Sequence, residues 1–158
     1  MSGGTARELR WAVAAAAAWS ALCVALDAAG HVPSGPTPLD RWYRIQAGLV
    51  WVVVPLQALL ADAVARRLAG VPAARGSVSA AFGIGLLVFV AVDAVAWSAV
   101  GFERLGGVLA VSAPLCLLLM TVLGARGLMR AGAPALRSMA AVLVGLLTAV
   151  IVGGGLLR

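Results

Sequence analysis

Charged side chains are scarce in this sequence. They make up 11% of its 158 residues, whereas hydrophobic residues make up 63%. A typical soluble domain is about a quarter charged, so this chain has too few polar groups to cover a globule in water. The composition therefore excludes an ordinary soluble domain and predicts an integral membrane protein.

Histidine and cysteine are nearly missing, and this limits the chemistry. His31 is the one histidine, and Cys23 and Cys116 fall in different hydrophobic stretches. A haem or zinc site needs several such ligands, and a disulfide or redox pair needs two neighbouring cysteines. No nucleophile stands beside a base in the sequence either. We therefore expect no metal, no cofactor, no catalytic residue and no enzyme.

Five hydrophobic stretches are present instead, at about 11–29, 45–66, 78–101, 105–124 and 136–157. Each is near the roughly 20 residues that a helix needs to cross a bilayer. Alternation with a period of two residues is absent, which argues against a membrane β-barrel. The sequence predicts an all-α integral membrane bundle, a single domain over residues 1–158. The first stretch follows two arginines as a signal peptide does, but no convincing cleavage site follows it, so we expect an uncleaved span.

The arginines predict the orientation. With the N-terminus in the cytoplasm, eight of the twelve arginines lie on the cytoplasmic side and four on the other, which favours N-in and C-out. The net charge of +6 then reflects topology and attraction to anionic lipid headgroups, and no nucleic acid is expected. Arginine in place of every lysine, with so much alanine, favours a GC-rich bacterial genome and the bacterial inner membrane.

The stretch "DRWYRIQAGLVWVVVPLQALLAD" at 40–62 begins as an interface anchor and continues as a membrane span. We expect its aromatic and basic residues to lie at headgroup depth, with Asp40 as the cap of a helix that begins there. The anchor residues are Arg41, Trp42, Tyr43 and Arg44.

Pro55 lies inside this span and Pro114 inside the fourth, and each removes one helical hydrogen bond. Each of these prolines marks either a static kink that fits the bundle or a moving hinge.

Two internal similarities suggest a repeat. "PLQALLADAVARR" at 55–67 resembles "PLCLLLMTVLGAR" at 114–126, and "AAFGIGLLVFVAV" at 80–92 resembles "AAVLVGLLTAVIV" at 140–152. The second and third spans would then recur as the fourth and fifth with parallel orientation, as in some transporters. Chance matches are common in sequences so rich in Ala, Val, Leu and Gly, so both explanations stay open.

Small residues recur at four-residue spacing on two spans, which predicts ridges that let helix backbones approach closely. These ridges serve either packing within the chain or contact with a partner. Their members are Ala17, Ala21, Ala25 and Ala29 on the first span and Ala141, Gly145, Ala149 and Gly153 on the fifth.

Three polar residues inside the spans, Asp93, Asp62 and Gln57, are candidate sites. Asp93 lies deep in the third span, where a carboxylate is costly, so it is either a proton or substrate site or a neutral, hydrogen-bonded acid that joins two helices. Gln57, Ser98 and Thr148 are candidate partners by residue type. Asp62 lies four residues before Arg66, and we expect an ion pair between them.

Three motifs resemble the bacterial branch of the Ypt-interacting protein (Yip) family. They are the entry from Tyr to Gln at 43–46, Gly-Ser and an apolar residue at 76–78, and a Leu-Gly stretch ending in Arg at 123–126. The resemblance covers residues 40–158 and implies five spans and a membrane scaffold. It supplies no catalytic residues.

The sequence thus favours a non-enzymatic membrane scaffold or accessory subunit that acts through helix contacts. The alternative is a small transporter or proton-coupled channel that uses Asp93. Expected partners are membrane lipids and either other membrane subunits or further copies of the chain.

Overall fold

The structure, a computed structural model, describes residues 3–29, 38–72, 76–100 and 105–156. These residues form helices and short connections, with no strand among them. The helices are α1 (Gly3–Ala28), α2 (Pro38–Ala69), α3 (Ser77–Val100), α4 (Leu105–Arg130) and α5 (Ala135–Leu156). The predicted all-α fold is therefore confirmed.

Three helices, α1, α2 and α4, extend beyond the predicted hydrophobic stretches, whereas α3 and α5 match them to within one residue at each end. α2 begins at Pro38, seven residues before the predicted span, because a helix continues through the polar interface after the apolar run ends. Proline is well suited to a first helical turn, where its missing N–H has no partner to lose. Asp40 therefore lies inside the first turn of α2 and not at its start, and its side chain, which we predicted as the cap, is outside the described part of the chain.

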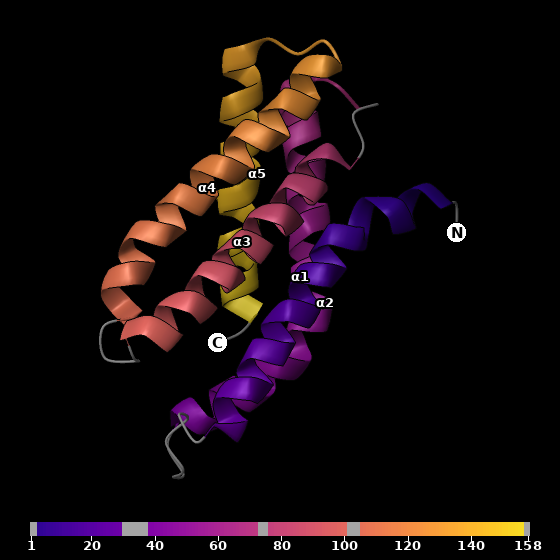
Figure 1. The fold of residues 1–158 in the computed structure, drawn as a ribbon. Helices are drawn as coiled ribbons and strands as arrows, with labels where there is room; N and C mark the ends of the chain where they lie inside the picture. Colours follow the sequence, from indigo (N-terminus) through magenta and orange to yellow (C-terminus); the bar gives the residue numbers. More distant parts are fainter. Residues whose placement is uncertain (1–2, 30–37, 73–75, 101–104, 157–158) are drawn as a thin grey trace.

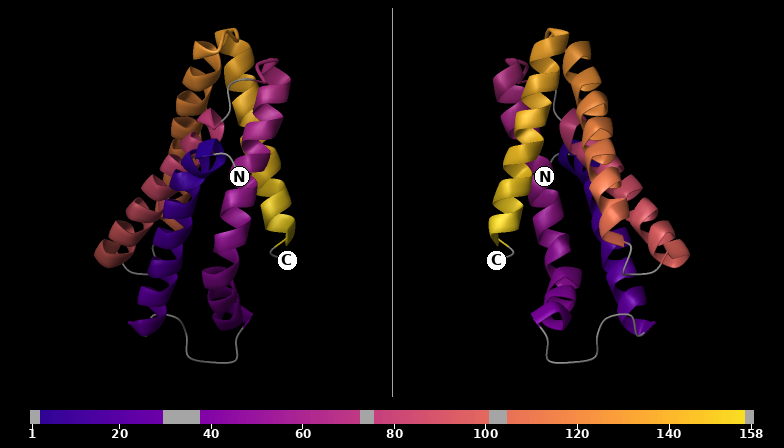
Figure 2. Two further views of the ribbon diagram at one scale, coloured as in Figure 1. Left: turned by 90° about the vertical axis from the view of Figure 1, so that its right-hand side faces the viewer. Right: turned by 90° about the vertical axis from the view of Figure 1, so that its left-hand side faces the viewer.

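Two pairs of helices form the body of the bundle (Figure 1). α2 packs most extensively against α5, and α3 packs to a similar extent against α4 and α1. α1 lies across α2 and α3, and the hydroxyl of Ser20 on α1 donates a hydrogen bond to the carbonyl of Ala47 on α2 at 3.0 Å. α4 and α5 meet near their connection and diverge away from it (Figure 2). The two pairs thus form two arms that are close at one end.

All five helices are long and apolar enough to cross a membrane. Large apolar side chains point outward from several of them, as at Val52 (66% exposed), Val95 (67%) and Ile151 (72%). In water this surface would aggregate, whereas lipid tails solvate it at no cost. The chain is an integral membrane protein.

The small-residue ridge on α5 packs inside the chain. Ala141 and Ala149 are 3% and 0% exposed, and Gly145 and Gly153 are also buried. A Cβ atom at Gly145 would lie 2.6 Å from the backbone oxygen of Ala61 on α2. The α5 ridge is therefore the contact surface for α2.

The predicted ridge on α1 faces the other way. Ala21, Ala25 and Ala29 are exposed and Ala17 is half-buried, so the ridge does not serve packing within the chain. A different small-residue face of α1 is fully buried, at Ala12, Ala15 and Ala16. It reaches α3 at Gly83, where a Cβ atom would collide with the backbone of Trp11 and Ala12.

We predict that Gly145→Ala destabilises the bundle, because the added methyl group has to push α5 away from the α2 backbone. The expected loss is about 1–3 kcal/mol, typical of overpacking at a tight contact. Thermal unfolding in detergent would measure it.

Gly48→Ala on α2 is the matched control, since a Cβ atom there meets nothing within 4 Å. It should be neutral or slightly stabilising, because alanine favours helix over glycine. Equal effects of the two substitutions would contradict the close α2–α5 contact.

Candidate functional site

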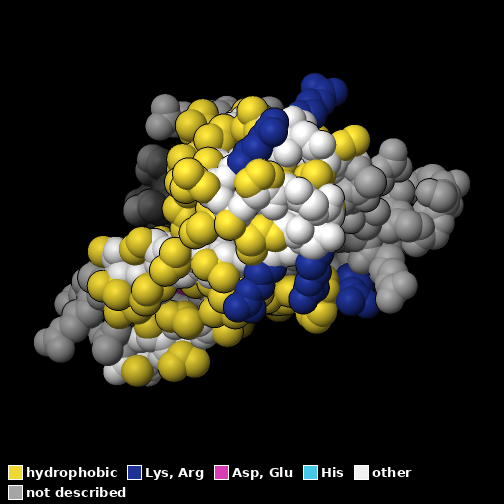
Figure 3. Space-filling model, turned by 90° about the horizontal axis from the view of Figure 1, so that it is seen from above, with side chains coloured by type: hydrophobic (Ala, Val, Ile, Leu, Met, Phe, Trp, Pro, Cys, Tyr) yellow, Lys and Arg dark blue, Asp and Glu magenta, His cyan; other side chains and the backbone are white. Residues whose placement is uncertain are grey.

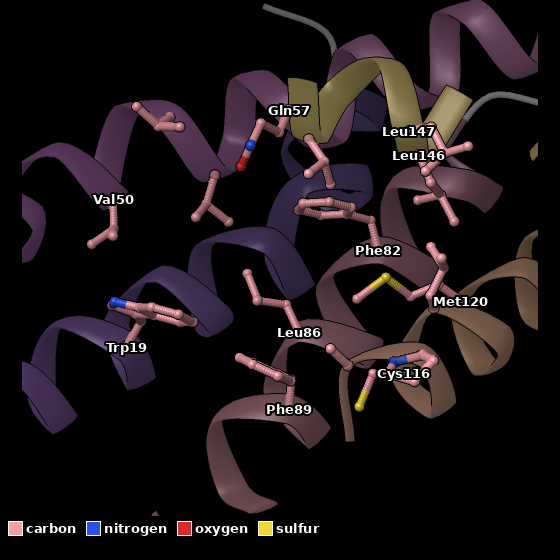
Figure 4. Close-up of a pocket in the computed structure, with 16 residues that line it drawn as sticks. Trp19, Val50, Gln57, Phe82, Leu86, Phe89, Cys116, Met120, Leu146 and Leu147 are labelled. Atoms are coloured by element: carbon pink, nitrogen blue, oxygen red, sulfur yellow. The ribbon is translucent and has the colours of Figure 1, made fainter. Parts of the chain in front are cut away.

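A pocket of about 620 Å³ lies between the two arms of the bundle (Figure 4). All five helices contribute to its wall. The rings of Trp19 on α1 and Phe89 on α3 stack at its wall, with centroids 6.1 Å apart and planes 14° from parallel. Phe82 and Met120 line its middle, from α3 and α4.

The wall of this pocket is apolar. Among its described residues no side chain is charged, and the polar groups are the amide of Gln57, the thiol of Cys116 and the indole N–H of Trp19, a buried donor with no hydrogen-bond partner among the described residues. The size and the lining are those of sites that bind apolar molecules between helices of a bundle. The pocket can therefore hold a hydrocarbon surface, and it offers no counter-charge to an ion.

Gln57 is held in place at the pocket wall. Its amide nitrogen donates a hydrogen bond to the carbonyl of Ala149 on α5 at 3.1 Å. Gly153 lies against the same amide, and a Cβ atom there would collide with it. Within the described chain no donor is paired with the amide oxygen of Gln57, so this oxygen can accept a hydrogen bond from an occupant.

Asp62 is buried at 4% exposure and is fully engaged. The predicted ion pair is present, with Arg66 Nε 2.7 Å from Asp62 Oδ2. The backbone N–H groups of Gly76 and Val78 also donate to the carboxylate, at 3.3 and 3.1 Å. Because α3 begins at Ser77, Asp62 caps the N-terminus of α3 from the side of α2, where a negative charge is stabilising.

The capping role of Asp62 was not predicted. Its partners on the α3 side lie 14 and 16 residues away along the chain, whereas the pair with Arg66 is local. Arg66 also donates to the carbonyl of Pro72 at 3.0 Å, which ties the end of α2 to the following connection. The Asp62 cluster is a structural joint between α2 and α3.

Asp93 lies in α3, outside the set of residues that line the pocket. Its Oδ1 atom is buried and has no hydrogen-bond partner among the described residues. The three candidate partners, Gln57, Ser98 and Thr148, each donate to a backbone carbonyl instead. The structure thus brings none of them to Asp93.

Both prolines lie inside helices that continue through them, so neither ends a helix. Pro114 lines the pocket, whereas Pro55 does not.

Two further predictions fall outside what the structure describes. Arg41, Trp42, Tyr43 and Arg44 belong to α2, but their side chains are outside the described part of the chain, and so is His31. In the described ranges no three His, Cys, Asp or Glu side chains gather closely enough to hold a metal ion.

No family model, no curated protein and no solved structure matches this chain. The resemblance to the Yip family therefore stays a prediction, and the function has to be argued from the structure.

We predict that Asp62→Asn lowers the free energy of unfolding by about 1.5–3 kcal/mol, since hydrogen bonds to a charged group contribute about this much each. The substitution removes the charge that Arg66 and the start of α3 share. Unfolding in detergent, followed by helix content, would measure the loss.

Arg67→Gln, one residue beyond Arg66 and exposed, is the control and should change stability by less than about 0.5 kcal/mol. If Asp62→Asn changes stability no more than this control, Asp62 is not the joint between the two helices.

Proposed function

We propose that the protein is a non-enzymatic membrane scaffold or accessory subunit, which acts by packing its helices against a helix of another membrane protein. The observation that carries this proposal is the apolar pocket between the arms. Its described wall combines aromatic and aliphatic side chains with one fixed amide and no charge.

The side chains around a space of this size gain dispersion contacts when an apolar surface occupies it. In a membrane that surface is a lipid chain or the apolar face of another helix. A polar solute or an ion would have to shed its hydration against this wall without receiving a counter-charge. The chemistry of the pocket therefore supports an apolar occupant and a role in assembly.

The charge distribution supports an N-in orientation. The end of the bundle that holds the α2–α3 and α4–α5 connections carries arginine side chains, and no carboxylate is visible there among the described atoms (Figure 3). An excess of arginine is typical of cytoplasmic ends. The described arginines of this end are Arg66, Arg67, Arg126, Arg130 and Arg137.

We predict that the protein extracted from its own membranes in a mild detergent carries a second membrane protein in fixed stoichiometry. Native mass spectrometry of the extract would give the mass and composition of the complex. A lone monomer, or copies of this chain alone, would contradict the accessory-subunit proposal.

Asp93 supports a second candidate function, proton-coupled transport. A buried carboxylate oxygen without a hydrogen-bond partner is costly in a membrane, and such residues often mark proton pathways.

For this function we predict that liposomes with the purified protein conduct protons and that Asp93→Asn abolishes the flux. Asp27→Asn, at an exposed acid near the end of α1, should leave it unchanged. If liposomes with the unmodified protein conduct protons no faster than empty liposomes, this candidate function is excluded.

A further inference from the structure

The similarity between the two halves of the sequence has a counterpart in the pattern of burial. Where α2 and α4 are aligned at Pro55 and Pro114, Leu59 and Leu118 are both exposed, at 39% and 56%. Two residues further on, Ala61 and Met120 are both buried, at 0% and 8%. The two helices therefore present the same face to the bundle.

Equivalent helices also make equivalent contacts. Exchanging α2 with α4 and α3 with α5 converts the close α2–α5 pair into the close α4–α3 pair. A Cβ atom at Gly145 would meet Ala61, and one at Gly85 would meet Met120. Gly145 and Gly85 occupy the same place in the aligned segments, as do Ala61 and Met120. The body of the bundle is thus two similar helix pairs related by a pseudo-twofold axis along the helices.

α1 breaks this symmetry. It lies between α2 and α3 (Figure 2), packs against both and covers one face of α3. On that face Ser79 is 1% exposed, Val90 is 5% exposed, and Gly83 touches the α1 backbone.

The corresponding face of α5 is open. Met139, Leu143 and Val150 take the places of Ser79, Gly83 and Val90, and they are 42%, 39% and 54% exposed. Leu147, on the same face, is 44% exposed. The face of α3 that α1 covers is therefore exposed in its counterpart on α5.

The groove between α4 and α5 is therefore the counterpart of the groove that α1 fills, and α4 and α5 diverge beside it (Figure 2). Ala113, Pro114 and Leu117 from α4 and Leu147 and Val150 from α5 line it, and all five belong to the wall of the apolar pocket. We propose that this groove binds one transmembrane helix of a different membrane protein. The proposal rests on the scaffold function above and specifies where the partner binds.

The chemistry of the bound helix follows from α1. Its contact face should be apolar and rich in small residues, as α1 is at Ala12, Ala15 and Ala16, because Met139 and Leu143 on α5 take up the room that Ser79 and Gly83 leave on α3. The pseudo-twofold axis runs along the helices, so the partner helix should cross the membrane in the same direction as α1. The face of α1 at Ala12, Ala15 and Ala16 is buried against its own α2 and α3, so this face of a second copy does not fit. Binding through the exposed ridge on the α1 of a second copy would give an adduct of two copies of this chain in the test.

The test is photo-cross-linking in native membranes. A photoreactive amino acid replaces Leu147 in one strain and Val152 in another. Both residues are on α5 and are equally exposed, at 44% and 43%, but five residues of helix place them about 140° apart. We expect the photoreactive residue at position 147 to form an adduct with a transmembrane helix of another protein, which mass spectrometry would map. The residue at position 152 should form no such adduct.

Three results would overturn the inference: equal adducts at both positions, an adduct of two copies of this chain at position 147, or no protein adduct at position 147, as expected if lipid fills the groove. The extraction experiment separates this failure from that of the scaffold function. A co-extracted protein without an adduct at position 147 leaves the scaffold function in place with a different docking surface. The absence of both overturns both.

Discussion

The close approach of helix backbones is the constraint on which this bundle depends. In lipid the burial of apolar surface gives helices no advantage, so they associate where small side chains allow extensive van der Waals contact. Gly145 on α5 meets the backbone of α2 at Ala61, and Gly85 on α3 leaves room for the side chain of Met120 on α4. These two contacts hold the two arms. The space between the arms exists because α4 and α5 do not stay close to each other along their length.

The polar groups inside the spans differ in how well they are satisfied. Asp62 shares its charge with Arg66 and with two backbone N–H groups at the start of α3, so its burial is compensated at a joint that two helices need. Asp93 has one buried oxygen without such a partner among the described residues. The buried carboxylate of Asp62 therefore stabilises the fold. The unpaired oxygen of Asp93 costs free energy, so Asp93 remains a candidate for function.

An odd number of helices gives the bundle its asymmetry. Two similar pairs would close into a symmetric four-helix body, and α1 covers one of the two equivalent grooves. The faces of α3 and α5 that correspond therefore meet different surroundings, although Gly85 and Gly145 in them make equivalent contacts. The residues differ accordingly: Gly83 meets α1 and Ser79 on the same face is buried, whereas Met139 and Leu143 are exposed. The two equivalent grooves thus differ: α1 of the chain itself occupies one of them, and the other is left open for a partner.

The sequence by itself determined the class of the protein, its five helices and the ion pair of Asp62 with Arg66, because hydropathy, length and four-residue spacing are local properties of the chain. Only the tertiary structure decided which small-residue ridge faces inward. The repeats on α1 and α5 have the same spacing, yet Gly145 is buried and Ala25 is exposed. The cap on α3, the apolar pocket and the open groove were likewise beyond the sequence, since each is made by residues of different helices. Spacing along one helix defines a face, but what that face meets depends on how the other helices pack.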